Sequence, residues 1–288
     1  MDVNIRPAVP ADIAVCGQIT YAAFKGINER HGFENFEFPT VEVACENAEF
    51  KIHNPSYYNI VAEASGQVIG LCFLDEHNSI RGVDLVCIDP ATQGEGVGRK
   101  LMENALERSL GSRGVRLLQH SFNTTSLALY ASLGFEVKEP LMLMYGRPIG
   151  QPQNDVEIHP MRSEELDQCE ALHEKILGFG RINEIRANLH LFTPLVALRA
   201  SHIVAYASAP AMPPVNHVVA ETEDDLRALL LGISASMTDP LVLLLPIRRA
   251  SFFRWCLEQG LKVVKPYTLM ALGEYQEPAG YYLPSAVF

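Results

Sequence analysis

The sequence predicts an α/β fold, in the form of an α+β mixed sheet, present in two tandem domains of related structure. Three observations support this prediction. The chain has 288 residues, and at about 150 residues per domain this length suits two domains. Short apolar stretches alternate with helical patterns, as in chains that combine strands and helices. Segments of the first half recur in the same order in the second half, which indicates a duplicated unit.

The repeat begins near the start of each half. Residues 3–16 read Val-Asn-Ile-Arg-Pro, then carry an acid–aliphatic pair, and end on Cys16. Residues 156–169 read Val-Glu-Ile-His-Pro, carry a second acid–aliphatic pair, and end on Cys169. Each block is typical of a short strand, a proline stop and the acidic first turn of a helix. Both halves therefore open with the same pair of elements.

Two later segments also recur. Residues 61–70 and 196–205 each place two apolar strands around a tight turn, which Ser65-Gly66 supplies in the first half. The segments 126–144 and 251–270 share an aromatic residue, a glycine, a lysine, a proline and a Leu-Met ending. Because the matches keep their order, we expect each element of the first half to have a counterpart in the second.

These matches predict the domain limits. We expect a first domain over residues 1–146, a linker over 147–154 and a second domain over 155–288. The linker region is rich in Gly, Pro, Gln and Asn, a composition that is typical of a connection between domains.

Composition limits the partners that we expect. Hydrophobic residues make up 48% of the chain, which is enough for a folded core. The net charge of −11 disfavours nucleic acid and anionic membranes as partners. The six cysteines form no Cys-x-x-Cys pair, so we expect buried thiols in a reducing compartment and no metal site. With no visible signal peptide and no apolar run that could span a bilayer, we expect a cytoplasmic protein.

A glycine-rich turn carries the clearest chemical signal. Residues 83–88 predict a strand that Asp89-Pro90 ends. Glycine lets the backbone adopt positive φ and approach a ligand, and the free amides of a first helical turn attract anions. The turn consists of Gln93, Gly94, Glu95, Gly96, Val97, Gly98 and Arg99, and an amphipathic helix with Leu101, Met102, Ala105, Leu106 and Leu110 on one face follows it. This corner predicts a pyrophosphate site, to which Arg99 would add a positive charge.

The glycine spacing excludes two other phosphate-binding motifs. The chain lacks the P-loop pattern Gly-x-x-x-x-Gly-Lys-Ser/Thr, and the dinucleotide pattern would need glycine where Arg99 or Leu101 stands. Instead Gln93-x-x-Gly96-x-Gly98, after Ile88-x-Pro90 and before the helix, resembles the acetyl-CoA signature of the GNAT superfamily of N-acetyltransferases. The resemblance covers about residues 3–146 and implies a GNAT-like fold.

The elements after the turn follow the order of that family. Residues 115–119 read as a strand, and a short helix that carries Tyr130 ends at Leu133-Gly134. Two strands are then expected, over residues 136–137 and 141–145.

The resemblance also implies where acetyl-CoA, the acyl donor of the family, is held. The backbone amides from Gln93 to Arg99 would bind its pyrophosphate. Val86, Cys87 and Ile88 would pair with the pantetheine arm as if it were another strand. Asn123 would lie near that arm, and Tyr130 would lie near the thioester sulfur.

Acetyl transfer to an amine needs a proton acceptor and a proton donor. An alkylammonium with a pKa of about 10.4 is protonated at pH 7, and only the neutral amine attacks a thioester. By the resemblance, Tyr130 would protonate the leaving thiolate. Many family members carry a glutamate on the strand before the turn, but Gly82 and Asp84 stand at the closest positions here. Asp84 is either the base, directly or through water, or a strand-edge carboxylate; His120 and Glu76 are weaker candidates for the base.

An acidic segment rich in phenylalanine follows the first helix. Residues 28–51 hold six glutamates and only two basic residues, Arg30 and Lys51, with Phe33, Phe36 and Phe38 among them. In the family this segment commonly borders the acceptor. It is either an acidic, aromatic rim that favours a cationic amine or a solvated loop anchored by its aromatic side chains.

The second half has lost the signature. Residues 215–220 should correspond to the strand before the turn, but Glu221-Thr-Glu-Asp-Asp follows them where a pyrophosphate would lie. We expect a helix over 225–232, and Trp255 takes the place of Tyr130. The second domain is therefore predicted to be degenerate and without a cofactor. Its apolar tail, residues 281–284, is expected to pack against the first half.

We thus expect an N-acetyltransferase that moves an acetyl group from acetyl-CoA to a primary amine by direct attack, with no covalent enzyme intermediate. The acceptor would be a small molecule or a peptide, with a cationic charge that suits the acidic chain. The sequence leaves the oligomeric state open. The alternative is a non-catalytic sensor or interaction module that binds acyl-CoA, since the glutamate common in the family is absent.

Overall fold

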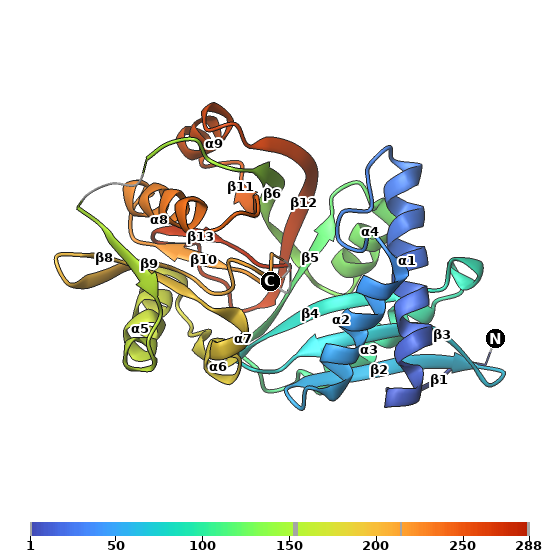
Figure 1. Cartoon of the computed structure of the whole chain (residues 1–288). Helices are drawn as coiled ribbons and strands as arrows, with labels where there is room; N and C mark the ends of the chain where they lie inside the picture. Colours follow the sequence, from blue (N-terminus) through green and yellow to red (C-terminus); the bar gives the residue numbers. More distant parts are fainter. Residues whose placement is uncertain (1, 152–154, 214, 287–288) are drawn as a thin grey trace. The chain divides into compact units, whose positions relative to one another are not determined.

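The chain divides into two compact units. The structure is a computed structural model that describes residues 2–151, 155–213 and 215–286 (Figure 1). Among these, the first unit holds residues 2–136 with Ala271–Gly273, and the second holds Val137–Met270 with Glu274–Ala286. The domain limits predicted from the sequence stay a prediction, and residues 152–154 of the predicted linker lie outside the described residues.

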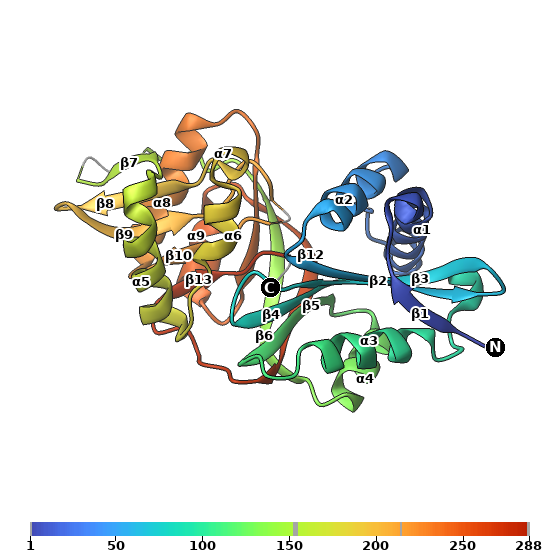
Figure 2. The same ribbon diagram turned by 90° about the horizontal axis from the view of Figure 1, so that it is seen from below.

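The first unit is a mixed sheet with helices on both faces. Its strands follow the order β1-β2-β3-β4-β5 and are antiparallel except for the parallel pair β4–β5. Helices α1 and α2 cover one face, and α3 and α4 cover the other (Figure 2). The elements are β1 (Asn4–Pro7), α1 (Ile13–Arg30), α2 (Val41–His53), β2 (Tyr57–Ala64), β3 (Gln67–Asp75), β4 (Ile80–Ile88), α3 (Val97–Arg108), β5 (Gly114–His120) and α4 (Thr124–Ser132). The predicted α/β fold with a mixed sheet is confirmed.

Local hydrogen bonds begin the first two helices. Before α1, Asp12 accepts from Val9 N at 2.9 Å and forms an ion pair with Arg6 at 2.7 Å. Before α2, the Thr40 side chain accepts from Val43 N. Such caps satisfy amides that have no partner inside the helix.

The face covered by α1 and α2 holds an apolar core. Side chains from both helices pack on alternate residues of the central strands, among them Leu71, Phe73 and Leu85. Cys16 and Cys87 belong to this core, and burial raises the pKa of each thiol to about 12. Five of the six cysteines are buried and all six are free thiols, which confirms the prediction of buried thiols for all but Cys45.

The second unit also combines strands with helices. One sheet follows the order β13-β10-β9-β8-β7, and β6 pairs antiparallel with β11 in another. The elements are β6 (Glu136–Gly146), β7 (Glu157–Pro160), α5 (Leu166–Leu177), α6 (Ile182–Ala187), α7 (Leu189–Phe192), β8 (Leu195–Arg199), β9 (His202–Ala207), β10 (Val218–Ala220), α8 (Glu223–Ser236), β11 (Leu241–Pro246), α9 (Ala250–Glu258), β12 (Lys262–Gly273) and β13 (Tyr281–Leu283). β6, which closes the first sequence repeat, thus belongs mostly to the second unit.

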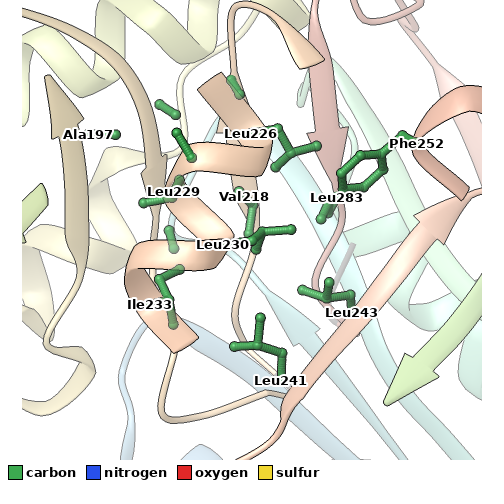
Figure 3. Packing of buried hydrophobic residues seen from close by; sticks show 14 of the residues in the cluster. Ala197, Val218, Leu226, Leu229, Leu230, Ile233, Leu241, Leu243, Phe252 and Leu283 are labelled. Atoms are coloured by element: carbon green, nitrogen blue, oxygen red, sulfur yellow. The ribbon is translucent and has the colours of Figure 1, made fainter. Parts of the chain in front are cut away.

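The core of the second unit surrounds α8. Leu226, Leu229 and Ile233 of this helix belong to one buried cluster with side chains of β8, β10, β11 and β13, and Leu226 lies beside Leu283 (Figure 3). Leu283 of β13 lies in the same cluster. Since full burial of one such side chain contributes about 1.5–3 kcal/mol, the short strand β13 is an integral part of this core.

The strand registers show which residues of the two halves correspond. The sequence repeat aligns Gly70 with Ala205, and these residues pair with Ile88 and Ala220 respectively. The residue that follows each of these strands makes the same backbone hydrogen bond. Asp89 N donates to Ile69 O, and Glu221 N donates to Val204 O, both at 2.9 Å. The ends of β4 and β10 are therefore equivalent.

One expectation about individual elements was confirmed with wider bounds, and two were wrong. The helix predicted over 225–232 is present as α8 and extends over Glu223–Ser236. Gly232 lies where α8 packs against Ile158, and a Cβ there would collide. The strands predicted over 136–137 and 141–145 are one strand, β6, which continues through Pro140; the carbonyl of Pro140 accepts from Ile247 N at 3.2 Å. The apolar tail pairs with β10 in the sheet of its own unit, as β13.

No helix in the described part of the chain is both long enough and apolar enough to cross a membrane.

Candidate active site

The glycine turn lies between β4 and α3 and is open on its outer side. After a short 3-10 turn at Pro90–Thr92, Gly94 and Gly96 adopt φ angles of +89° and +80°. Residues with a Cβ are strained at such angles. A Cβ at either glycine would meet no atom within 4 Å, so the turn leaves room for a ligand.

The first turn of α3 presents backbone amides at this opening. Lys100 N donates to Gly96 O at 3.2 Å. The amides of Val97, Gly98 and Arg99 therefore come before the hydrogen-bond ladder of the helix begins. Aligned with the helix dipole, they attract a negative group such as a pyrophosphate.

The side chains around the turn have defined partners. Gln93 Nε2 donates to Ile88 O at 3.3 Å and ties the turn to the end of β4. Arg99 donates to Ser132 Oγ at 2.6 Å, and its guanidinium thus reaches α4. Glu95 is exposed, so its carboxylate is solvated outside the turn.

Strands β4 and β5 separate next to the glycine turn. Their parallel pairing runs from Ile80↔Gly114 to Val83↔Leu117 and, over the described residues, stops there. β4 continues to Ile88 and stays paired with β3 on its other edge. Because backbone groups alternate between the two edges of a strand, some groups of residues 84–88, which include Val86, Cys87 and Ile88, point into the gap between β4 and β5. We call this gap the β4–β5 opening.

Asp84 lies where this opening begins. The register with β3 shifts between Phe73↔Leu85 and Leu74↔Val83, so Asp84 is the extra residue of a β-bulge. Its carboxylate forms an ion pair with Lys51 of α2, and the two side chains are only 6% and 3% exposed. Burial raises the pKa of Asp84, and the Lys51 ammonium opposes that rise.

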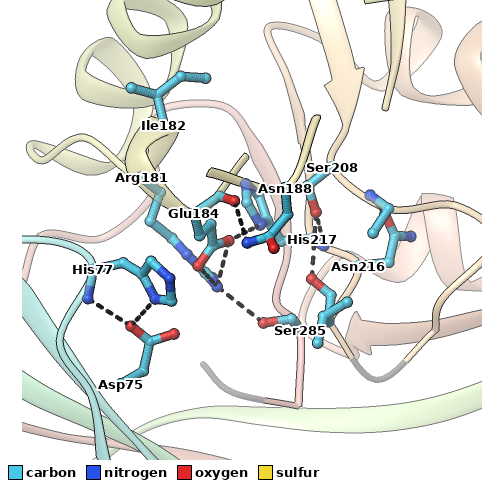
Figure 4. A network of polar contacts seen from close by, with 12 residues as sticks. Asp75, His77, Arg181, Ile182, Glu184, Asn188, Ser208, Asn216, His217 and Ser285 are labelled. Carbon is cyan, nitrogen blue, oxygen red and sulfur yellow. Dashed lines mark hydrogen bonds and ion pairs between the residues drawn. The ribbon is translucent and has the colours of Figure 1, made fainter. Parts of the chain in front are cut away.

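The surroundings of this ion pair are aromatic and acidic. Lys51 Nζ lies 5.9 Å from the ring centres of Tyr57 and Phe73. Nearby on β3, Asp75 Oδ1 accepts from His77 N and lies 2.8 Å from His77 Nδ1 (Figure 4). No group of three or more His, Cys, Asp or Glu side chains in the described part of the chain could hold a metal ion.

Tyr130 and Asn123 belong to α4, on the opposite face of the sheet from Lys51. Asn123 caps this helix by accepting from Ser126 N at 3.2 Å. Tyr130 is buried, and burial together with the nearby Cys72 and Cys87 raises its pKa. The phenol is therefore a protonated group at neutral pH that can donate.

His120 and Glu37 form a pair at the end of β5. His120 Nε2 lies 2.9 Å from Glu37 Oε1, and the two side chains are 6% and 16% exposed. Phe24 of α1 contacts the imidazole edge-on at 5.5 Å between ring centres. His120 therefore lies on the α1/α2 face of the sheet, as Lys51 and Asp84 do. The acidic, aromatic segment predicted from the sequence does reach the end of β5.

Aromatic rings continue from this pair. Phe122 stacks on His120 at 4.8 Å, and Phe33 stacks on Phe122 at 4.6 Å. Of the weaker candidates for the base, Glu76 binds Arg108 of α3 through two hydrogen bonds, at 3.1 and 2.9 Å. The pairings of Lys51 with Asp84 and of Glu37 with His120 were not predicted, since each joins residues far apart in the sequence.

Comparison with known proteins identifies this part of the chain. Residues 55–137 match the family model for the acetyltransferase (GNAT) domain. They form a GNAT acetyltransferase domain. The resemblance noted in the sequence is thereby confirmed for the segment that contains β4, the glycine turn, α3, β5 and α4.

The chain spans less than a third of the length of each of the two curated relatives named here. The chain is 37% identical over 99 residues to a mycothiol acetyltransferase of Amycolatopsis mediterranei, 30% of this chain and 32% of that protein. It is 43% identical over 54 residues to an uncharacterized protein of Mycobacterium leprae, of which 15% is covered.

Solved structures resemble the whole chain in fold. A Pyrococcus horikoshii protein assigned to the acetyltransferases is 17% identical, with a TM-score of 0.75 over 99% of this chain and 95% of that one. A tandem GNAT protein of clavulanic acid biosynthesis is 12% identical, with a TM-score of 0.58 over 97% and 99% of the two chains. The chain therefore has the fold of a tandem GNAT protein.

The second unit has a different corner at the place that corresponds to the glycine turn of the GNAT domain. Only Glu221 and Thr222 separate β10 from α8. Thr222 Oγ1 accepts from Asp225 N at 3.2 Å, so the helix is capped by its own side chain. β13 pairs with β10, as Val218↔Leu283 to Ala220↔Tyr281. These residues of β10 are equivalent to Val86–Ile88 of the GNAT domain.

A buried polar network lies elsewhere in the second unit. Arg181 donates to Glu184 at 3.0 Å and to Ser285 Oγ at 3.2 Å, and His217 Nδ1 lies 3.1 Å from Glu184 (Figure 4). Burial lowers the pKa of His217 and of the neighbouring His173 well below the ordinary value. Both imidazoles are therefore neutral at pH 7.

Proposed function

We propose that the GNAT domain transfers an acetyl group from acetyl-CoA to a primary amine of a small molecule or peptide. The observation that supports this most is the position of the glycine turn beside the β4–β5 opening. The turn offers amides and an open cradle for a pyrophosphate, and the opening offers strand edges for an extended arm. These two features suit the two chemical parts of coenzyme A.

Each predicted binding residue has a role in this proposal. The amides of residues 93–99 bind the pyrophosphate, and Arg99 adds positive charge at the start of α3. The edge of Val86–Ile88 that faces the β4–β5 opening hydrogen-bonds the pantetheine arm. Asn123 holds the start of α4 and so positions Tyr130, whose hydroxyl is directed to the thioester sulfur.

The reaction is a direct displacement. The lone pair of the neutral amine forms the new C–N bond, and the C–S bond of the thioester breaks. The sulfur takes a proton from Tyr130, which remains protonated up to high pH because burial raises its pKa. The amine loses one proton, for which Asp84 is the candidate base from the sequence. The Lys51 ammonium beside Asp84 would lose its counter-charge if Asp84 took that proton.

We also propose a single cofactor site per chain. In the second unit β13 occupies the edge of β10 that is equivalent to the edge of Val86–Ile88 facing the β4–β5 opening. The acids Glu223, Asp224 and Asp225 lie in the first turn of α8, and they would repel a pyrophosphate there. The acceptor is a cationic amine in this proposal, because residues 28–51 carry six glutamates and one of them, Glu37, lies beside His120 at the end of β5.

Calorimetric titration of the purified chain with acetyl-CoA tests this proposal. We expect one site per chain, and at least about a 100-fold loss of affinity in Gly96→Glu, where a carboxylate enters the anion site, equal to about 2.7 kcal/mol. Gly111→Glu is the matched control, since Gly111 also has a positive φ of +88° and open space around it. Two sites, or unchanged binding by Gly96→Glu, would contradict the proposal.

Turnover is measured separately, with acetyl-CoA and a panel of mono- and polyamines. Release of free thiol that depends on the amine supports the enzyme. Tight binding with no turnover of any amine, together with unaltered behaviour of Tyr130→Phe in cells, would instead support an acyl-CoA sensor.

A further inference from the structure

We propose that His120, held by Glu37, is the group that takes the proton from the acceptor amine, which rests on the proposed acetyl transfer. Three observations carry this inference: the place of His120 on β5, its contact with Glu37, and the burial of the other candidate, Asp84, against Lys51.

The first observation is the place of His120 in the sheet. β5 leaves β4 after Val83↔Leu117, and His120 is the last residue of β5 beyond that point. It shares the α1/α2 face with Asp84, whereas Tyr130 lies on the other face. A proton acceptor and a proton donor at separate places around the β4–β5 opening suit acyl transfer, in which one proton leaves the attacking nitrogen and another reaches the departing sulfur.

The second observation is the contact with Glu37. A carboxylate 2.9 Å from Nε2 fixes the orientation of the ring. It also stabilises the imidazolium that forms when the ring takes a proton. Glu37 therefore acts as a positioning residue, and His120 acts as the catalytic base.

The third observation concerns Asp84. Its carboxylate is buried with the Lys51 ammonium as its ion-pair partner. A proton on Asp84 would leave that ammonium buried without a counter-charge, which is strongly unfavourable. An imidazole that becomes charged beside Glu37 gains an ion pair instead. The same transfer is thus opposed at Asp84 and assisted at His120.

Groups from several elements face His120. Glu37 comes from the loop between α1 and α2, Phe24 from α1, and Phe122 from the segment after β5. His31, at the end of α1, contacts the far ring Phe122 at 5.0 Å and is the second titratable ring of this group. Any pH dependence of His120 must therefore be separated from that of His31.

The proton balance is complete with these residues. The ammonium form of the acceptor gives one proton to bulk water and becomes the neutral amine. After attack, the nitrogen gives its second proton to His120. Tyr130 gives a proton to the sulfur as the C–S bond breaks, and both residues then exchange protons with water. No oxidant, metal or further reactant is required.

The test measures the rate and its pH dependence. We expect His120→Gln to lower kcat/KM by about 100-fold or more and to remove the limb of the pH–rate profile that rises between about pH 5 and 8. Glu37→Gln should lower kcat/KM by about 10-fold, because the imidazolium loses its counter-charge. His31→Gln is the matched control and should keep the limb.

The outcomes separate this inference from the proposed function. If no amine of the panel is acetylated by the wild type, the function and this inference both fail. If the wild type is active and His120→Gln keeps its rate and its pH limb, this inference alone is wrong. His120→Asn serves as a second variant, and binding of acetyl-CoA by calorimetry shows that each variant is folded.

Discussion

The two strand–turn–helix corners of the molecule start from equivalent residues but differ in whether the first turn of the helix is open to a ligand. β4 ends at Ile88 and β10 at Ala220, and the same hydrogen bond to the neighbouring strand follows each. The first corner then passes through Asp89–Gly96 and leaves the amides of α3 open. The second passes through Glu221–Thr222 alone and caps α8 with its own side chain. The comparison teaches that a ligand site depends on one connection, while the surrounding fold is shared.

The gap beside each corner differs in the same sense. In the first unit, among the residues that the structure describes, the pairing of β4 with β5 ends at Val83↔Leu117, before the strand edge of residues 84–88. In the second unit the equivalent edge is paired with β13, and Leu283 is packed into the core. In the second unit a strand of the chain, β13, therefore pairs with the edge whose equivalent in the first unit would pair with an extended ligand.

A third difference lies shortly before the two strand ends. Asp84 precedes Ile88 at the same spacing at which Asn216 precedes Ala220. Asp84 forms a buried ion pair with Lys51, while Asn216 accepts from Ala209 N at 2.9 Å. The charged pair of the first unit is thus replaced by a neutral hydrogen bond in the second.

The largest expected effect comes from breaking the ion pair. Lys51→Met leaves the Asp84 carboxylate buried without its partner and should cost about 3–5 kcal/mol in the free energy of unfolding. The loss of the ammonium raises the pKa of Asp84 further, so the deficit should be greatest at neutral pH and should shrink as the pH falls toward about 4. Urea unfolding across this range measures it.

The double variant Lys51→Met/Asp84→Asn gives position 84 the neutral amide side chain that Asn216 has in the second unit. It should recover most of the lost stability, since neither charge then remains unpaired. If Lys51→Met alone is as stable as the wild type, the ion pair does not contribute to the free energy of unfolding, and the comparison of Asp84 with Asn216 fails.

The next largest effect concerns β13. Leu283→Ala should lower the free energy of unfolding by about 2–5 kcal/mol, because Leu283 is 2% exposed in the core of the second unit. It should also speed hydrogen exchange at the amides of Val218–Ala220. Leu191→Ala, at a side chain that is 53% exposed, is the control. Unchanged exchange in Leu283→Ala would mean that β13 does not protect that edge.

A smaller effect follows from the buried imidazoles of the second unit. The pKa values of His173 and His217 are lowered in the fold by burial. Their contribution is therefore present above the unfolded value of about 6.5 and is lost as the pH falls below it, by up to about 1.4 kcal/mol per pH unit for each ring. Unfolding between pH 7.5 and 5.5 should show this slope, and His217→Gln should reduce it. His53→Gln, at an exposed position, should leave the slope as it is.

The local parts of both corners could be predicted from the sequence, and the long-range parts could not. The glycines, the strand before them and the helix after them are neighbours in the chain, so periodicity and residue type predicted their order. The partners of Asp84 and His120 lie on α2 and in the loop before it, and a pairing such as Glu37 with His120 spans 83 positions. No local pattern records such a contact. The apolar residues of the tail at 281–284 suit packing against the first half as well as pairing within the second unit. The sheet topology shows that the tail pairs with β10.

The smallest expected effect separates stability from binding at two helix caps. Thr222→Ala in α8 and Asn123→Ala in α4 each remove a side chain that accepts from a first-turn amide, and each should cost about 1 kcal/mol. Only Asn123→Ala should also weaken acetyl-CoA binding, by a few-fold, because α4 carries Tyr130 beside the β4–β5 opening. Thermal unfolding and calorimetry on both variants measure the two quantities. Equal loss of binding in both variants would mean that the cap acts through general stability, and that the two corners are not functionally distinct.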